Sequence, residues 1–186
     1  MTEKPPVLDA GFRALFDAHS GYVMKSLRRL GVRPGDLEDL THEVFVAVLR
    51  KWDTFDPARP PRPWLFAFAL RLASAYRQSA YIRRERLEEA EPPGVVSTEH
   101  LLMEREESSL VYRALDTLDH DKRVVFTMFE LDERTAADIA TELGIPQNTV
   151  FSRLRTARLE FTQAVKRLSR EPSSSLSRSP ERPHAQ

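Results

Sequence analysis

Basic side chains are concentrated in one stretch near the C-terminal end of this 186-residue chain. Between Val150 and Arg170 the only acid is Glu160. The same stretch carries the basic residues Arg153, Arg155, Arg158, Lys166, Arg167 and Arg170. Guanidinium and ammonium groups at this density suit contact with nucleic-acid phosphates. A solvated basic helix face is the alternative interpretation of the same pattern.

The residues around this stretch predict how it is positioned. Thr135 and Asp138 have capping-box spacing, which marks the start of a helix. Gly144 can end that helix in the left-handed conformation, and Pro146 fits at the start of the next one. The apolar stripe continues on both sides of the turn: Ile139, Ala140, Leu143, Val150, Leu154 and Ala157. This layout predicts a helix-turn-helix, whose second helix enters the DNA major groove. An ordinary αα-hairpin of a helical bundle is the alternative.

The rest of the chain also reads as helix, and no strand pattern is present. Apolar residues at helical spacing predict helices over about 11–30, 37–51, 64–89 and 99–118, with a further helix capped by Asp119 or Asp121. Asp36 is expected to cap the second of these helices, and Pro63 to open the third. Val111 is expected to face inward, and Leu159 to continue the apolar stripe of the last helix.

The chain therefore predicts an all-α fold of two small helical domains joined by a flexible linker. Pro92-Pro93-Gly94 breaks the helical pattern. The predicted divisions are an N-terminal tail over 1–10, a first domain over 11–86, a linker over 87–106 and a second domain over 107–169. The tail over 170–186 is rich in Ser, Pro and Arg and is expected to be disordered.

Composition excludes several function classes. The chain has no cysteine, which excludes disulfides and thiolate metal sites. No apolar run approaches the ~18 residues that a membrane span needs, and no signal peptide is visible. A cytoplasmic protein without membrane insertion is expected.

No catalytic constellation is visible. His42-Glu43 begins like a zinc-protease helix but lacks the second histidine at i+4. The acids Asp36, Glu38, Asp39 and Glu43 could ligate a metal, but a solvated helix N-terminus is the favoured interpretation. We therefore expect no enzyme activity, no metal and no cofactor.

Charge is distributed unevenly, although the net charge is zero. The same four acids precede a basic stretch that contains Arg50, Lys51, Arg59, Arg62, Arg71, Arg77, Arg83, Arg84 and Arg86. An acidic surface next to a basic one would suit two partners of different character. Ordinary mixing of surface charge is the alternative.

Two sets of motifs resemble a known family. Residues 36–45, 52–57 and 63–66 resemble the second conserved region of bacterial sigma factors, and residues 144–158 resemble the fourth. Only these two regions are present, which is typical of the extracytoplasmic-function group of the sigma-70 family. The resemblance covers roughly Phe12 to Leu168. It implies an alternative sigma factor that binds core RNA polymerase and initiates transcription of a specific regulon.

The resemblance also implies roles for residues of the first domain. In the family, the acidic helix docks on the β′ clamp helices of core RNA polymerase, while the fourth region contacts the β flap. The residues carried over for core-polymerase binding are Asp36, Asp39, Leu40, Glu43 and Val44. In the family, the following loop and helix open the −10 promoter element and hold an everted base, which suits aromatic and cationic side chains. The residues carried over for −10 binding are Arg59, Arg62, Trp64, Arg71 and Arg77. Among Trp64, Phe66, Phe68 and Tyr76, helical spacing predicts that most belong to the core.

In the family, the fourth region reads the −35 element as duplex DNA. The residues carried over are Gln147, Asn148, Thr149, Ser152, Arg153, Arg155 and Thr156. Arginine can pair with guanine, and Asn or Gln with adenine, whereas Thr149 and Ser152 suit phosphates. Phe151 stands where the family usually has a basic residue. Pro60-Pro61 and Ala69-Leu70-Arg71-Leu72 also depart from the family pattern in the −10 region.

The linker is long enough for two promoter contacts. Twenty residues could span roughly 66 Å when extended, and one turn of DNA is roughly 34 Å. Members of this family are often held inactive by an anti-sigma factor, so such a partner is expected. A free-standing helix-turn-helix regulator is the competing hypothesis, but it would not need the acidic helix or the aromatic and basic first domain.

Overall fold

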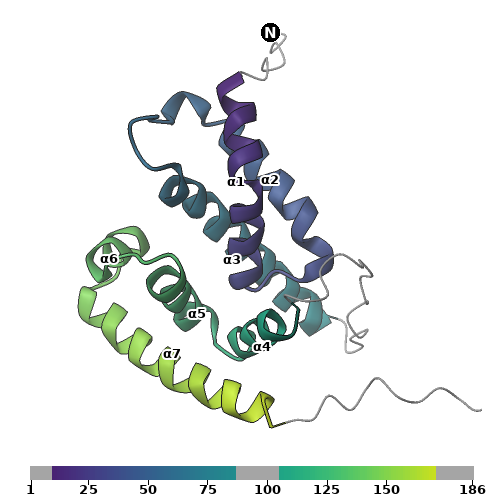
Figure 1. Cartoon of the computed structure of the whole chain (residues 1–186), viewed down its shortest axis with the longest axis vertical. Helices are drawn as coiled ribbons and strands as arrows, with labels where there is room; N and C mark the ends of the chain where they lie inside the picture. The colour runs from purple at the N-terminus through teal and green to yellow at the C-terminus, as the bar shows by residue number, and fades with distance from the viewer. Residues whose placement is uncertain (1–9, 87–104, 171–186) are drawn as a thin grey trace, which may run out of the picture.

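The computed structural model describes residues 10–86 and 105–170, which Figure 1 draws as ribbon. These residues form helices joined by short turns, and they contain no strand. The predicted all-α fold is therefore confirmed. Most of the predicted linker and nearly all of both predicted tails lie outside the described residues.

The N-terminal module is built from three long helices. They are α1 (Ala10–Arg29), α2 (Leu37–Leu49) and α3 (Pro61–Arg86). Short 3-10 turns at Pro34–Asp36 and Trp52–Thr54 flank α2. All three helices pack against one another. The fully buried residues come from each helix and from the α1–α2 turn, among them Val23, Leu27, Val32, Val44, Val48, Leu65 and Phe66.

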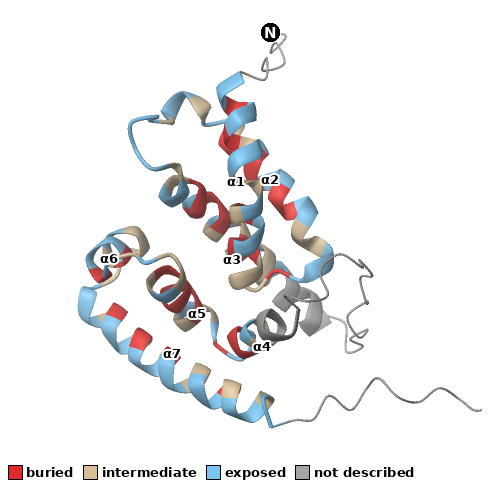
Figure 2. Cartoon of the chain, in the orientation of Figure 1, coloured by how far each residue is buried: buried red, intermediate tan, exposed pale blue. Residues whose placement is uncertain are grey.

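The C-terminal module is built from four helices and one π-helical turn. They are α4 (Arg105–Leu115), α5 (His120–Phe126), the π turn Thr127–Leu131, α6 (Ala136–Leu143) and α7 (Gln147–Leu168). The long α7 packs along α4, α5 and α6. Figure 2 shows buried residues on the side of α7 that faces these helices and exposed ones on its outer side.

Several predicted helix boundaries differ from the structure. The third helix begins at Pro61 rather than Trp64, since proline is accommodated in the first turn of a helix. Asp119 caps α5 by accepting a hydrogen bond from the Lys122 N–H, which settles the choice between Asp119 and Asp121. Pro146 is the residue before α7, so the helix begins one position later than predicted.

Three side chains do not behave as predicted. Asp36 makes no capping hydrogen bond, because its carboxylate accepts a hydrogen bond from the Tyr76 hydroxyl instead. Val111 was expected to face inward, but 38% of its surface is exposed. Leu159 is 60% exposed, because it lies on the outer side of α7. Apolar type alone did not distinguish the two faces of these helices.

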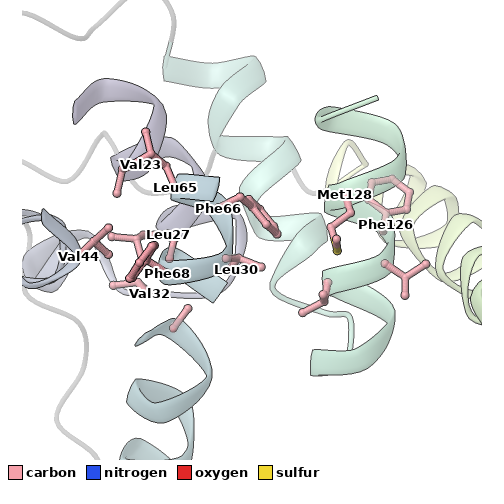
Figure 3. Packing of buried hydrophobic residues seen from close by; sticks show 14 of the residues in the cluster. Val23, Leu27, Leu30, Val32, Val44, Leu65, Phe66, Phe68, Phe126 and Met128 are labelled. Carbon is pink, nitrogen blue, oxygen red and sulfur yellow. The ribbon is translucent and has the colours of Figure 1, made fainter. Parts of the chain in front are cut away.

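The two modules are in contact in this structure. One continuous hydrophobic cluster includes residues from both of them. Figure 3 shows Leu30 and Phe66 on the side of the N-terminal core that faces Met128 and Phe126 of the C-terminal module. Leu30, Phe66 and Met128 are fully buried. The contact therefore excludes water from apolar side chains of both modules, which stabilises this arrangement.

Candidate promoter and polymerase interfaces

The helix-turn-helix forms as the sequence predicts. The Thr135 hydroxyl accepts a hydrogen bond from the Asp138 N–H at 3.2 Å and donates one to the Asp138 carboxylate at 2.6 Å. Gly144 is left-handed with φ +64°, and the Ile145 N–H bonds to the Ala140 carbonyl at 3.1 Å. Glycine adopts the left-handed conformation without a steric penalty, so the local sequence is sufficient to place the turn.

The first turns of α7 present a polar face to solvent. Val150, Leu154 and Ala157 are buried against the rest of the module. Five of the residues expected to bind the −35 element are exposed around the opposite side: Gln147, Asn148, Ser152, Arg155 and Thr156. Thr149 and Arg153 are half-buried at the edge of this face. The helix thus presents donors and acceptors at positions from which they could reach base edges.

Several of these side chains already have partners. Arg153 makes an ion pair with Asp121 of α5 at 2.6 Å. The Ser152 and Thr156 hydroxyls donate to carbonyls of their own helix, at Thr149 and Ser152 respectively. Arg155 makes no ion pair with any residue that the structure describes. Arg155 is therefore the most available cation on the face.

Two large apolar side chains lie beside this polar face. Phe151 is 50% exposed, and Leu159 is two turns further along α7 with 60% of its surface exposed. Arg155 lies midway between them at helical spacing. Phe151 was identified from the sequence as a departure from the family pattern. Leu159 was missed, since helical spacing placed it with the core.

The acidic helix separates into a partner-facing side and a core-facing side. Asp39 and Glu43 of α2 are exposed one turn apart, and they could contact a partner protein. Leu40 and Val44, also expected to bind core polymerase, are 9% and 0% exposed. In this structure they position the helix and do not present their side chains to solvent, so their part in core binding stays a prediction. Asp36 is half-buried and bonded to Tyr76.

One residue on the exposed side of α2 was not identified from the sequence. Val46 lies one turn beyond Glu43 and is 49% exposed. Its position in the sequence could have indicated this exposure, because Val46 is three residues after Glu43 and does not share the i, i+4 spacing of buried Val44 and Val48. Asp39, Glu43 and Val46 therefore form a stripe that mixes acid and apolar character, as a protein-docking surface often does.

Aromatic rings connect α1, the α2–α3 loop and α3. Phe12 packs on Trp52, Trp52 stacks on Phe55, and Phe55 contacts Trp64, with ring centroids 5.5, 4.8 and 5.1 Å apart. Trp64 also meets the Phe68 ring edge-on at 5.1 Å. Phe66 and Phe68 are buried, as helical spacing predicts. Trp64 is half-buried, so part of its ring is accessible at the start of α3.

The arginines expected at the −10 element have different surroundings. Arg59 is 84% exposed at its side chain and pairs with its loop neighbour Asp56 at 3.2 Å. Arg71 is exposed, with its guanidinium 5.4 Å from the Phe68 ring centroid. Arg62 lies over the Tyr22 ring at 5.2 Å. Arg77 is half-buried against Gly31, so in this arrangement it does not project freely into solvent.

Within residues 10–86 and 105–170, no group of three or more His, Asp or Glu side chains could hold a metal ion. Over the same residues, no helix is long and apolar enough to cross a membrane.

Two family models match the chain, one in each module. The model described as "Sigma-70 region 2" matches residues 15–85, and the model "Sigma-70, region 4" matches residues 108–161. The first contains α2 and the aromatic loop, and the second contains the helix-turn-helix. The two regions occur in the order that the motifs predict.

Curated relatives align with most of this chain. The ECF RNA polymerase sigma-E factor of Escherichia coli K12 is 28% identical over 150 residues, which span 75% of this chain and 78% of that protein. The RNA polymerase sigma factor NccH of Alcaligenes xylosoxydans is 26% identical over 157 residues, which span 81% and 84% of the two chains.

Solved structures show the same fold. The sigma factor RpoE of Bartonella quintana, solved with the anti-sigma factor NepR, aligns with a TM-score of 0.70 and 16% identity over 85% of this chain and 98% of that one. CnrH, solved with the cytosolic domain of CnrY, aligns with a TM-score of 0.56 and 23% identity over 84% and 88%. Together, the paired regions, the relatives and the all-helical fold place this chain in the extracytoplasmic-function group of the sigma-70 family, as an alternative sigma factor that binds core RNA polymerase and initiates transcription at specific promoters.

Proposed function

We propose that three separate surfaces of the chain divide the work of promoter recognition. The observation that carries the proposal is that an acidic helix face and a polar helix-turn-helix face occur on different modules of one chain. A free-standing regulator would need only the second of these. The protein is proposed to act in the cytoplasm and to have no catalytic activity of its own.

The exposed stripe of α2 is proposed to dock on core RNA polymerase. Asp39 and Glu43 supply negative charge, and Val46 supplies an apolar contact one turn beyond Glu43. Buried Leu40 and Val44 hold the helix in register on the core without touching the partner. Replacing Asp39 by lysine should weaken core binding about tenfold, since reversal of one interfacial charge is costly. Asp17→Lys, at an exposed acid of α1, is the matched control.

The loop before α3 and the first turns of that helix are proposed to hold the opened −10 strand. Arg59, Arg62 and Arg71 offer charge to the phosphates, and the accessible part of Trp64 offers a surface on which a base can stack. Arg77 is also proposed to contact this strand. It could do so only after it leaves its position against Gly31.

The polar face of α7 is proposed to read the −35 element in the major groove. Arg155 and Arg153 suit guanine, Gln147 and Asn148 suit adenine, and the hydroxyls of Thr149, Ser152 and Thr156 suit phosphates or base edges. Arg153 would exchange its ion pair with Asp121 for a contact with DNA.

An anti-sigma factor is proposed as a regulatory partner. Of two solved structures with the same fold, one holds the sigma factor RpoE bound to the anti-sigma factor NepR, and the other holds CnrH bound to the cytosolic domain of CnrY. The likeness of this chain to those two structures in fold supports the same kind of control here.

Run-off transcription with purified core polymerase on genomic fragments is the deciding test. A specific transcript that requires this chain is expected, together with co-migration of the chain and core enzyme. If neither is observed, the residue assignments above lose their basis. If core binding occurs and Asp39→Lys weakens it no more than Asp17→Lys, the assignment of the α2 stripe is wrong while the rest stands.

A further inference from the structure

The contact between the two modules is centred on a buried arginine. Arg123 lies on α5 of the C-terminal module, yet only 2% of its surface is exposed. Its Nε donates to the Arg29 carbonyl, and its Nη2 donates to the Arg28 carbonyl at 3.1 Å. Both carbonyls belong to the last turn of α1 in the N-terminal module. The guanidinium thus caps the negative end of a helix in the other module, where a cation is favoured.

Arg123 keeps its charge in this position. Burial lowers its pKa, and the neighbouring Asp116 opposes that effect, which leaves a value of about 10. Asp116 pairs with Arg123 at 2.9 Å and bonds through both oxygens to Arg28 of α1, at 3.2 and 3.1 Å. One carboxylate of the C-terminal module therefore joins a cation from each module.

A glycine provides the space for this contact. Gly31 follows α1 with φ +102°, a conformation that favours glycine. A Cβ at this position would lie 2.8 Å from Arg77 Nη1 and 3.2 Å from Arg123 Nη1. Two guanidinium groups, one from each module, therefore pack against the glycine.

A second polar contact joins the modules at the other end of the interface. Asp132 follows the π turn, and its carboxylate accepts from the Tyr22 hydroxyl at 3.2 Å and pairs with Arg29 at 3.4 Å. Its side chain is 7% exposed. Beside it, Arg62 and Pro63 of the N-terminal module face the turn Leu131–Arg134 across a cavity of about 540 Å³. The start of the proposed −10 surface thus lies beside the C-terminal module and stays exposed.

This arrangement differs from the one that promoter binding requires. The proposed function, on which this inference rests, places the modules on elements more than one turn of DNA apart, and a turn is roughly 34 Å. In this structure the cores of the two modules are in contact instead. The polar face of α7 is exposed in the closed arrangement, whereas Arg77 of the −10 surface is held against Gly31 beside Arg123.

We propose that the free protein holds itself in a closed state, latched by Arg123 on the end of α1 and by Asp132 on Tyr22 and Arg29. This latch holds Arg77 of the proposed −10 surface at the module contact but leaves the −35 surface accessible, and it must open before the modules can separate on a promoter. Because the latch lies within the chain, it operates without a partner protein.

Distances between spin labels on the full chain test the latch. The chain has no cysteine, so cysteines introduced at exposed Ala58 and Gln163 place one label on each module. The wild type should give one narrow distance distribution. Arg123→Ala should lengthen and broaden it, with a rise of about tenfold in the open-to-closed ratio, since hydrogen bonds to a charged group are lost. A broad wild-type distribution would overturn the proposal.

Lys122→Ala is the matched control. Lys122 is the neighbour of Arg123 on α5, but its ion pairs, with Asp119 and Glu160, stay within the C-terminal module. Its removal should leave the distance unchanged. If Arg123→Ala melts the C-terminal module, as thermal denaturation would show, Asp132→Ala probes the other end of the latch. Unchanged distances in every folded latch variant would contradict the proposal.

Binding of short DNA to the free chain provides a second measurement. Arg123→Ala should raise affinity for a single-stranded −10 oligonucleotide and leave affinity for a −35 duplex unchanged. Equal changes on both DNAs would contradict the proposed selective effect on the −10 surface. Run-off transcription separates this inference from the proposed function: closed distances without any transcript would refute the function alone, whereas transcription with an open wild type would refute the latch alone.

Discussion

The two proposed DNA-binding surfaces are constructed differently. On α7, the exposed polar residues lie opposite the buried stripe, so the surface is complete without help from the rest of the chain. On the N-terminal module, Trp64 belongs to a row of packed rings, and Arg77 lies at the contact with the other module. The surface proposed to read duplex DNA is thus preformed on one helix. The residues proposed to hold the opened strand, in contrast, also pack within the N-terminal module or against the other module.

Replacing Trp64 by alanine should test this difference with the largest effect. Removal of the ring takes contacts away from Phe55 and Phe68, so the N-terminal module should lose about 2 kcal/mol of stability. Promoter opening, followed by permanganate reactivity of unpaired thymines, should fall as well. If the variant keeps its melting temperature but fails to open the promoter, the Trp64 ring contributes to DNA binding and not to packing of the module.

Replacing Arg155 by alanine should have the opposite profile. The side chain is exposed and makes no ion pair with a described residue, so stability should not change. Loss of a bidentate base contact should weaken binding to the −35 duplex by about 1.5 kcal/mol, which is roughly tenfold. Fluorescence anisotropy with labelled duplex measures the affinity. Lys166→Ala, at an exposed base near the end of α7, should change it less.

Replacing Phe151 by arginine should restore the charge that is typical of the family at this position. Phe151 is half-exposed, so the substitution leaves no cavity. One added phosphate contact should steepen the dependence of log affinity on log salt by about 0.9. The measurement is a salt titration of −35 duplex binding. An unchanged slope together with weaker binding would instead indicate that the ring contacts a base.

Acid should weaken the contact between the modules, with a smaller effect. His120 of α5 lies 3.1 Å from the Ser74 hydroxyl of α3, in the other module. Its pKa is lowered from the ordinary value of 6.5, first by burial and then by Arg77 and Arg123, although Asp121 and Asp119 oppose this. Arg153 of α7 lines the same small cavity.

The lowered pKa of His120 means that the closed state favours the neutral imidazole, so acid should destabilise the contact between the modules. That contribution is complete above pH 6.5 and is lost as the pH falls below 6.5 toward the lowered pKa. The distance between spin labels should therefore lengthen between pH 7.5 and pH 5.5. In His120→Gln, which cannot ionise, this pH dependence should be reduced, and an identical response in both proteins would exclude His120 as its source.

Local sequence predicted the helix-turn-helix well. Thr135, Asp138 and Gly144 act through hydrogen bonds and backbone conformations that span only a few residues, so their spacing is sufficient to place the turn. The buried stripe of α7 followed from periodicity in the same way. In α2, Leu40 and Val44 were carried over as contact residues from a resemblance that does not distinguish the faces of the helix, and both are buried.

Arg123 shows what local patterns missed. It precedes the apolar residues Val124, Val125 and Phe126, and a charged residue at the edge of such a run is a sequence signal for a buried ion. The sequence alone did not supply its partners, because the carbonyls that it caps lie 94 and 95 residues earlier in the chain. Exposure of Val46 and Leu159 was missed for a related reason, since exposure depends on which neighbouring elements cover a helix.

The sequence by itself determined the helices, the turn of the helix-turn-helix and the motifs of two sigma regions. These depend on spacing along the chain and on local backbone energetics. Only the tertiary structure decided which residues of α2 and α7 are exposed, and that Arg123 and Asp132 join the two modules. Burial is a property of contacts between distant segments, and its cost for a charged group is met only when those segments supply hydrogen-bonding partners.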